Sequence, residues 1–317
     1  MNMEQMSTPT VSIVIPAANA ADTIGESLRA IAAQDYPNIV DVVVAAADQA
    51  TAAAALLDGA TVVDNPSGTT PAGLNLAIDA SRGEIVVRVD AHSTVPPGYV
   101  SRAVRTLLET DADNVGGMQV PVGRSFWSRA IAAAMSSPAG AGDARHRIGG
   151  KAGPVDTVYL GAFRRATLDR FGGYDESFVR HQDYELNTRI RREGGTVWFD
   201  PELRVDYMPR PSLRLLARQY FDYGTWKRWF ARSNRGALRP RQLAPPLLVL
   251  ALAVSLGAAP VSPWSLLIPG VYLLGLVVAG LATVQTTGIA ASGVPIALLT
   301  MHISWGLGFL AGQTRDR

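Results

Sequence analysis

The sequence predicts an α/β domain with a mostly parallel, Rossmann-like sheet, followed by a C-terminal α-helical membrane segment. In the first part of the chain, apolar β-branched runs alternate with stretches of helical spacing, an order typical of parallel sheets with helices on both faces. The second observation is that residues 242–314 contain no Asp, Glu, Lys or Arg. Because a soluble domain hardly leaves so long a stretch uncharged, this part is expected to lie in a bilayer.

The composition suits one or two globular domains with an ample core. Of the 317 residues 48% are hydrophobic, and none is cysteine, which excludes disulfide bonds and thiolate metal sites. The formal net charge is only +2, but nine arginines are concentrated between residues 202 and 241. The first ten residues are polar and lack an apolar stretch, so no signal peptide is expected.

Four strand–helix pairs are expected along the first part of the chain. β-branched residues run nearly unbroken, as in buried parallel strands, over residues 11–16, 40–45, 61–63 and 85–89. Apolar residues recur at helical spacing over residues 22–31, in an alanine-rich stretch through Leu57, and over 70–80 and 96–110. The P-loop and the G-x-G-x-x-G pattern are both absent, so a diphosphate would have to be bound through a metal or cationic side chains.

Further strands are expected around residues 115–120 and 155–160, and further helices over 163–171 and 184–193. Between them, residues 136–154 are rich in Gly, Ala and Pro and include four basic side chains: Arg145, His146, Arg147 and Lys151. This segment is either a flexible basic loop or a lid over an anionic ligand.

Two residues at the end of the fourth expected strand have metal-ligand chemistry. The apolar run over 85–89 stops at Asp90, Ala91 and His92. Ligands of open α/β sheets collect at the carboxyl ends of strands, and one intervening residue lets a turning backbone aim both side chains at one ion. The alternative is a strand followed by a polar turn, because so short a motif often occurs by chance.

Asp183 is the candidate general base. It falls at or near the N-terminus of the expected helix over 184–193, where the helix dipole favours the carboxylate form that a base requires. The alternative is that Asp183 is simply the N-cap of that helix.

Together, these segments resemble the inverting family 2 glycosyltransferases with a GT-A fold, and above all their membrane-associated, succinoglycan-type exopolysaccharide branch. The resemblance covers about residues 11–230. It rests on six pieces in the order found in the family: residues 11–19, 65–77, 83–92, 161–165 with 172–176, 181–186 and 218–227.

The resemblance implies a role for several residues. Asp90 and His92 match the D-x-D motif of the family, which holds a nucleotide diphosphate through a divalent cation, and a carboxylate with an imidazole suits Mn²⁺ or Mg²⁺. Asp183 matches the aspartate that deprotonates the acceptor hydroxyl. Pro16 and Asn19 fall in the loop that touches the base and ribose of the nucleotide.

The chain departs from the family pattern in the nucleotide loops. Ala20 and Ala21 stand where glutamate is common, and three alanines, Ala45 to Ala47, stand where an aspartate usually reads the base. The nearest acid is Asp48, which becomes the candidate for that role. Arg145 and Arg147 are expected to add positive charge against the diphosphate, and Gln219 and Trp226 fall at acceptor-side positions of the branch.

Residues 212–232 mix basic and aromatic side chains at helical spacing, which is typical of an amphipathic helix at a bilayer surface. RNA binding through stacking aromatics is the alternative, but the uncharged stretch that follows favours the membrane, so no nucleic acid is expected as a partner. Apolar stretches over 243–259, 264–284 and 289–311 predict two or three crossings; helices in the core of a soluble domain are the alternative.

The arginines before the first apolar stretch place the catalytic domain in the cytoplasm, at the inner membrane. With three crossings Arg315 and Arg317 would lie outside, against the usual bias. The expected division is a GT-A catalytic domain over 1–211, an interfacial helix region over 212–241 and transmembrane helices over 242–317.

The sequence therefore predicts a membrane-bound, metal-assisted inverting glycosyltransferase. It would move a sugar from a nucleotide-diphosphosugar to a lipid-linked or cell-envelope glycan. One alternative is a polyprenyl-phosphate monosaccharide synthase, and another is a non-catalytic membrane scaffold with a degenerate glycosyltransferase domain.

Overall fold

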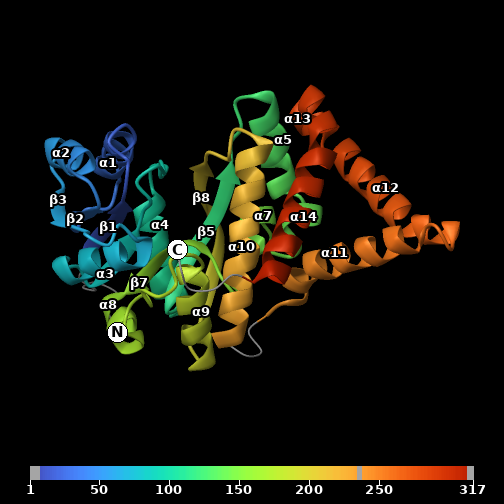
Figure 1. Ribbon diagram of the computed structural model, residues 1–317. Helices are drawn as coiled ribbons and strands as arrows, with labels where there is room; N and C mark the ends of the chain where they lie inside the picture. The colour runs from blue at the N-terminus through green and yellow to red at the C-terminus, as the bar shows by residue number, and fades with distance from the viewer. Residues whose placement is uncertain (1–7, 234–237, 313–317) are drawn as a thin grey trace. The chain divides into compact units, whose positions relative to one another are not determined.

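The computed structural model describes residues 8–233 and 238–312 and contains two compact units (Figure 1). The first unit comprises residues 1–119 and 149–206, and the second comprises residues 120–148 and 207–317. Residues 120–148 thus group with the C-terminal helices, whereas the sequence-based division assigned them to the catalytic domain. Arg235, Arg315 and Arg317 lie outside the described residues.

An eight-stranded mixed sheet has the strand order β3–β2–β1–β4–β7–β5–β8–β6. β1 pairs in parallel with β2 and β4, and β2 with β3, whereas β7 pairs antiparallel with β4 and β5. The predicted α/β class and parallel N-terminal half are confirmed. The strands are β1 (Val11–Ala17), β2 (Ile39–Ala46), β3 (Thr61–Asp64), β4 (Ile85–Arg88), β5 (Asn114–Pro121), β6 (Gly153–Pro154), β7 (Tyr159–Arg164) and β8 (Val197–Tyr207).

Helices cover both faces of the parallel strands, since successive side chains of β1 point to opposite faces. Ile13 and Ile15 belong to the apolar layer with α1 and α4, and Val14 belongs to the layer with α3, α8 and α9. Both layers are fully buried, as a parallel sheet requires. The helices of this unit are α1 (Ile24–Ala32), α2 (Gln49–Leu57), α3 (Thr70–Ala80), α4 (Tyr99–Thr110), α8 (Arg165–Phe171) and α9 (Gln182–Arg192).

The second unit is helical and has a core of its own. Ile131 and Met135 of α5, Leu216 of α10, and Leu298 and Met301 of α14 pack together in it. Residues 136–154, expected to be a loop or a lid, include the short helices α6 and α7. The helical segments of this unit are α5 (Phe126–Met135), α6 (Pro138–Ala141), α7 (Arg145–Ile148), α10 (Leu213–Ser233), α11 (Pro240–Ala258), η1 (Pro263–Leu266), α12 (Leu267–Leu281), α13 (Val284–Thr287), η2 (Gly288–Gly293) and α14 (Val294–Ala311).

α10 and α14 lie side by side at very close range (Figure 1). A β-carbon on Gly224 of α10 would lie 2.1 Å from the carbonyl oxygen of Trp305, and one on Gly308 of α14 would lie 2.1 Å from that of Phe221. Only glycine allows two helix backbones to approach in this way. Arg228 of α10 also donates to the carbonyl oxygen of Phe309 at 3.1 Å, which satisfies one of the last carbonyls of α14.

Among the described residues, three helical segments are long and apolar enough to cross a membrane: Pro240–Ala258, Pro263–Leu281 and Val284–Ala311. They coincide with the three apolar stretches expected from the sequence. α11 and α12 extend away from α10 and α14 (Figure 1) and leave many large aliphatic side chains exposed, among them Leu247, Leu250, Val254, Val271, Leu274 and Leu281. In water such a surface would be costly, whereas in lipid it costs nothing.

α10 is more deeply packed than a helix that only lies on a bilayer. Tyr220 and Phe230 are buried, with Tyr220 in the core of the second unit, so these two rings are not available to stack on bases or to enter lipid. The aromatic content of this segment therefore reflects packing at least in part, which its spacing alone did not reveal.

Candidate active site

The residues that follow three parallel strands meet at one edge of the sheet. Asn19 comes after β1, Asp48 after β2 and Asp90 after β4, and these strands are neighbours in the same parallel block. A hydrogen bond from Val89 N to Val14 O (3.1 Å) continues the parallel pairing up to the residue before Asp90. The carboxyl edge of such a block is where open α/β sheets bind their ligands.

Arg88, the last residue of β4, links Asp90 to Asp183. Its Nε and Nη2 atoms donate to Asp90 Oδ1 at 3.0 and 2.8 Å, and its Nη1 atom donates to Asp183 Oδ1. Burial alone would lower the pKa of Arg88, but the two carboxylates raise it well above its usual value, so the guanidinium stays charged. One buried cation is thus shared by the two acids that the sequence singled out.

Sequence reasoning did not assign a role to Arg88. The available signal was its position within the run Ile85 to Val89, which is otherwise apolar. A buried strand tolerates a guanidinium only where a carboxylate pairs with it, so this arginine already indicated an ion pair at the end of the strand.

Asp183 lies in the first turn of α9. His181, with φ 63°, occupies the N-cap position, so the alternative that Asp183 merely caps the helix is wrong. The Asp183 side chain is 38% exposed, which leaves the carboxylate accessible. Burial raises the pKa of Asp183, and the Arg88 guanidinium opposes part of that rise. The arrangement is a partly buried carboxylate held by a single cation.

Asp90 and His92 can supply two ligands for a divalent cation. Ser93 N donates to Asp90 O at 2.9 Å, so the chain turns directly after the strand and leaves His92 exposed on the turn. Asp90 Oδ2 accepts only a long hydrogen bond, 3.4 Å, from the hydroxyl of Tyr159. Within the described ranges no group of three or more His, Cys, Asp and Glu side chains could hold a metal. The pair fits Mn²⁺ or Mg²⁺ if phosphate oxygens of a donor complete the coordination.

Two of the segments that carry the resemblance hold each other in place. Asn75 of α3 donates to Tyr174 O at 2.9 Å and to Glu176 Oε1 at 3.0 Å, and Tyr174 N donates to Asn75 Oδ1 at 2.9 Å. The Tyr174 ring is buried, and Arg88 opposes part of the rise that burial causes in the pKa of its hydroxyl. Residues 65–77 and 172–176 therefore place a buried ring near the guanidinium that both acids share.

Pro16, Asn19 and Asp48 lie at the neighbouring strand ends, with Pro16 opposite Ala45 of β2. Asn19 has a left-handed φ of 50°, and its N–H donates to Asp48 Oδ2 at 2.7 Å. Asp48 also caps α2, because its Oδ1 accepts from Thr51 N at 2.9 Å and its Oδ2 from Thr51 Oγ1 at 2.8 Å.

These hydrogen bonds, first the one from the Thr51 backbone and then the one from Asn19, lower the pKa of Asp48. Asp48 thus ties the two loops together as an ionised carboxylate, and both of its oxygens already accept bonds within the protein. Base recognition by Asp48 stays a prediction.

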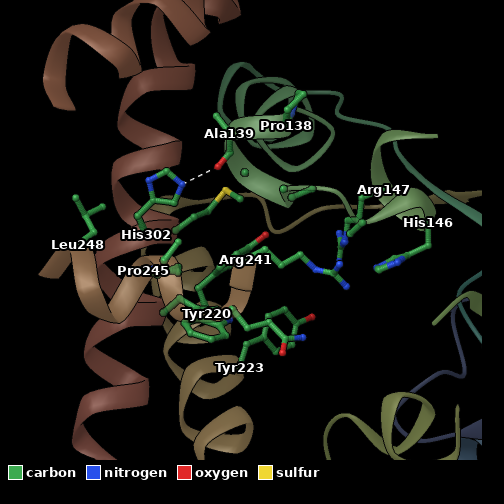
Figure 2. Close-up of a pocket in the computed structure, with 18 of the residues that line it drawn as sticks. Pro138, Ala139, His146, Arg147, Tyr220, Tyr223, Arg241, Pro245, Leu248 and His302 are labelled. Atoms are coloured by element: carbon green, nitrogen blue, oxygen red, sulfur yellow. Dashed lines mark hydrogen bonds between the residues drawn. The ribbon is translucent and has the colours of Figure 1, made fainter. Parts of the chain in front are cut away.

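Arg145 and Arg147 lie in α7, which belongs to the second unit. Arg147 and its neighbour His146 line a cavity within that unit (Figure 2). A role of Arg145 and Arg147 toward a donor diphosphate stays a prediction.

Comparison with known proteins adds three findings. Residues 9–222 match the family model described as glycosyltransferase like family 2. The chain is 30% identical over 256 residues to the succinoglycan biosynthesis protein ExoA of Rhizobium meliloti (strain 1021). The aligned region covers 78% of this chain and 76% of ExoA. The mannosyltransferase PcManGT of Pyrobaculum calidifontis, solved in complex with GDP-Man and Mn²⁺, is similar in fold with a TM-score of 0.60 and 20% identity, over 97% of this chain and 88% of the other.

Proposed function

The chain belongs to the family 2 glycosyltransferases, and we propose that it transfers a sugar with inversion from a nucleotide-diphosphosugar to a lipid-linked or cell-envelope glycan. The observation that carries this proposal is the sharing of Arg88 by Asp90 and Asp183 at the carboxyl edge of the sheet. Because Arg88 contacts both carboxylates, Asp90 on the donor side and Asp183, the base on the acceptor side, lie close to one another.

In the proposed reaction Asp183 takes the proton from the acceptor hydroxyl. The acceptor oxygen then forms a bond to the anomeric carbon of the donor while the bond from that carbon to the diphosphate oxygen breaks. The electron pair of the broken bond leaves with the nucleoside diphosphate. Attack from the face opposite the leaving group inverts the anomeric configuration.

Arg88 acts as a positioning residue for this base. A general base has to be deprotonated before the acceptor arrives, and burial works against that by raising the pKa of Asp183. The guanidinium offsets part of the rise and fixes the direction of the carboxylate through the Nη1 contact. Because Arg88 also binds Asp90, it fixes the position of the Asp183 carboxylate relative to that of Asp90.

Asp90 and His92 would hold the divalent cation of the proposed reaction. When bound, such a cation neutralises negative charge on the diphosphate. Mn²⁺ is bound in the structurally similar PcManGT, and the ligand pair here suits Mn²⁺ or Mg²⁺. Pro16, Asn19 and Asp48 would face the nucleoside, with Asp48 holding the two loops together.

Two observations support a membrane-held acceptor: the similarity to ExoA and the apolar C-terminal helices. ExoA is named for succinoglycan biosynthesis, and three segments of this chain are apolar enough to cross a bilayer. An enzyme anchored in this way meets acceptors that are themselves held at the membrane. With the arginines that precede α11 on the cytoplasmic side, the catalytic unit would face the cytoplasm at the inner membrane.

Asp183→Asn tests this function in the full-length protein, reconstituted in lipid nanodiscs and supplied with a panel of nucleotide sugars with and without Mn²⁺. Thermal shift identifies the donor, since a ligand of the folded state adds about 2.7 kcal/mol at a hundredfold excess over its dissociation constant. The variant should bind this donor normally but lose on the order of 10²–10⁴ in turnover, because only the base is removed.

The matched control is Asp79→Asn, an exposed carboxylate on α3 of the same unit, and its turnover should equal that of the unchanged protein. Near-normal turnover in Asp183→Asn would overturn the base assignment. Absence of a thermal shift with every donor would favour the scaffold alternative, and a product that carries one sugar on a polyprenyl phosphate would favour the monosaccharide synthase.

A further inference from the structure

A cavity of about 520 Å³ lies within the second unit, outside the site described above. α10, α11, α12 and α14 form most of its wall, and the segment with α6 and α7 forms the remaining side (Figure 2). All of its lining residues belong to the second unit, so the cavity exists independently of how the catalytic unit is placed.

One end of the cavity is cationic. Figure 2 shows the side chains of Arg147 and Arg241 extending toward one another, with His146 beside Arg147. Burial, followed by the charges of Arg147 and Arg241, lowers the pKa of His146 to about 3, so this ring is neutral and the two guanidinium groups carry the charge. Asp143 pairs with Arg241 at 2.5 Å, but its own side chain is 81% exposed and balances only one of the two cations.

This cationic end contains buried polar atoms without a partner. Arg147 Nη1 and His146 Nδ1 are both inaccessible to solvent, and neither makes a hydrogen bond with any of the described residues. Buried donors and acceptors are nearly always satisfied in folded proteins, so these two atoms leave hydrogen-bonding capacity unmet at this end of the cavity. A guanidinium that requires an acceptor matches an anionic oxygen, and its planar fork of donors fits the oxygens of a phosphate.

The opposite end of the cavity is apolar. α11 contributes Pro245 and Leu248, and α14 contributes Met301 and Trp305. α11 is also the first of the segments able to cross a membrane, and Leu247 on the same helix is 61% exposed. An apolar chain that leaves the cavity along α11 would therefore remain against apolar side chains.

His302 and Tyr272, in the wall between the two ends, are both hydrogen-bonded. His302 Nε2 donates to the carbonyl oxygen of Ala139 at 2.9 Å, because a carbonyl can only accept. In the neutral ring Nδ1 then accepts from the Tyr272 hydroxyl at 3.0 Å. These bonds join α6, α12 and α14 and hold the wall in place. Among the described residues, the lining side chains with buried unpaired atoms are His146 and Arg147, both at the cationic end.

We infer that this cavity binds a phosphate-bearing lipid, with the phosphate between Arg147 and Arg241 and the hydrocarbon chain against Leu248 and Trp305. A free phosphate would leave the apolar end without a ligand, and an alcohol would leave Arg147 unsatisfied. The inference adds to the proposed function a binding site for the lipid-linked acceptor. That the bound lipid is the acceptor rests on the proposed function, whereas lipid binding itself does not.

Binding of farnesyl phosphate to the full-length protein in neutral-lipid nanodiscs, measured by calorimetry without any nucleotide sugar, tests the inference. Farnesol provides the tail without the phosphate, and inorganic phosphate provides the phosphate without the tail. Farnesyl phosphate should bind at least about tenfold more tightly than either, because each fragment lacks one of the two matched contacts.

Arg147→Gln should weaken farnesyl phosphate binding about tenfold or more and leave the weak binding of farnesol unchanged. Arg241→Gln is a second variant with the same expectation, in case Arg147→Gln does not fold. The matched control is Arg214→Gln, an exposed arginine on α10 that does not line the cavity, and its affinity should equal that of the unchanged protein.

Equal affinities for farnesol and farnesyl phosphate would overturn the inference, as would unchanged affinity in both arginine variants. If inorganic phosphate binds as tightly as farnesyl phosphate, the site takes a soluble phosphate and the lipid assignment is wrong. Asp183→Asn should retain farnesyl phosphate binding, so loss of the glycosyltransferase assignment and loss of the lipid site give different results.

Discussion

At the scale of single residues, Arg88 holds the carboxylates of Asp90 and Asp183 in place. A guanidinium in a buried strand costs free energy of desolvation, which is recovered only while both carboxylates remain in contact with it. The planar group donates through three of its nitrogen atoms, two to Asp90 and one to Asp183. Lysine offers a point charge on a flexible stem and could not hold both acids in fixed directions.

Arg88→Gln should therefore destabilise the protein by about 3 kcal/mol, because it leaves two partly buried carboxylates without their cation. Arg88→Lys should fall between Gln and the unchanged protein in both stability and turnover. Thermal unfolding in detergent micelles measures the stability, and donor turnover measures the effect on the base.

The control for Arg88 is Arg29→Gln, which removes a 69% exposed arginine from a long contact (3.9 Å) with Asp58 and should change stability by less than about 0.5 kcal/mol. Equal unfolding temperatures for Arg88→Gln and Arg29→Gln would show that the buried cluster contributes no stability.

Sequence reasoning found both acids of this cluster but not the cation between them. Asp90 and Asp183 stand at the end of an apolar run and the start of a helix, which are local patterns. The contact of Arg88 with Asp183 joins two elements far apart in the chain, and no local pattern encodes it. The same limit applies to the bond between Asn19 and Asp48, which joins two loops that are 29 residues apart in the chain.

At the scale of elements, the parallel half of the sheet was predictable because buried parallel strands are short apolar runs between helices. α3 occupies the predicted residues 70–80. The strand expected over 155–160 is displaced, since β7 covers Tyr159–Arg164. Its limits are set by pairing with β4, in which Val87 faces Ala162 and Ile85 faces Arg164, and not by where apolar residues begin. β8 was not anticipated, because acids and an arginine interrupt its apolar alternation.

The contact between α10 and α14 gives the prediction at this scale. Gly308→Ala places a methyl group 2.1 Å from the carbonyl oxygen of Phe221, so the helices must separate, at a cost of about 1–3 kcal/mol. Gly275→Ala in α12 is the matched control, because no atom lies within 4 Å of its added methyl group and alanine favours a helix.

Thermal unfolding in detergent micelles compares the two glycine variants. A lower midpoint for Gly308→Ala together with an unchanged or higher midpoint for Gly275→Ala is the expected result. Equal midpoints would mean that the two helices do not depend on this close approach.

At the scale of the whole molecule, exposed aliphatic side chains on α11 and α12 should anchor the protein in the membrane. Leu250→Asp combined with Leu274→Asp adds one charge to each helix, at a cost of about 3–4 kcal/mol per helix in lipid. The fraction of protein that resists alkaline carbonate extraction from membranes should fall.

The control is Leu57→Asp, at an 89% exposed position of α2, which should leave that fraction unchanged. Equal extraction of both variants would contradict membrane insertion of α11 and α12.

The core of the second unit also determines when during synthesis that unit can fold. Ile131 and Met135 come from α5, whereas Leu298 and Met301 come from α14, near the far end of the chain. During translation α5 leaves the ribosome long before the residues that cover it exist, and contacts of such sequence separation form slowly. The apolar face of α5 therefore stays uncovered on the nascent chain until α14 has been made.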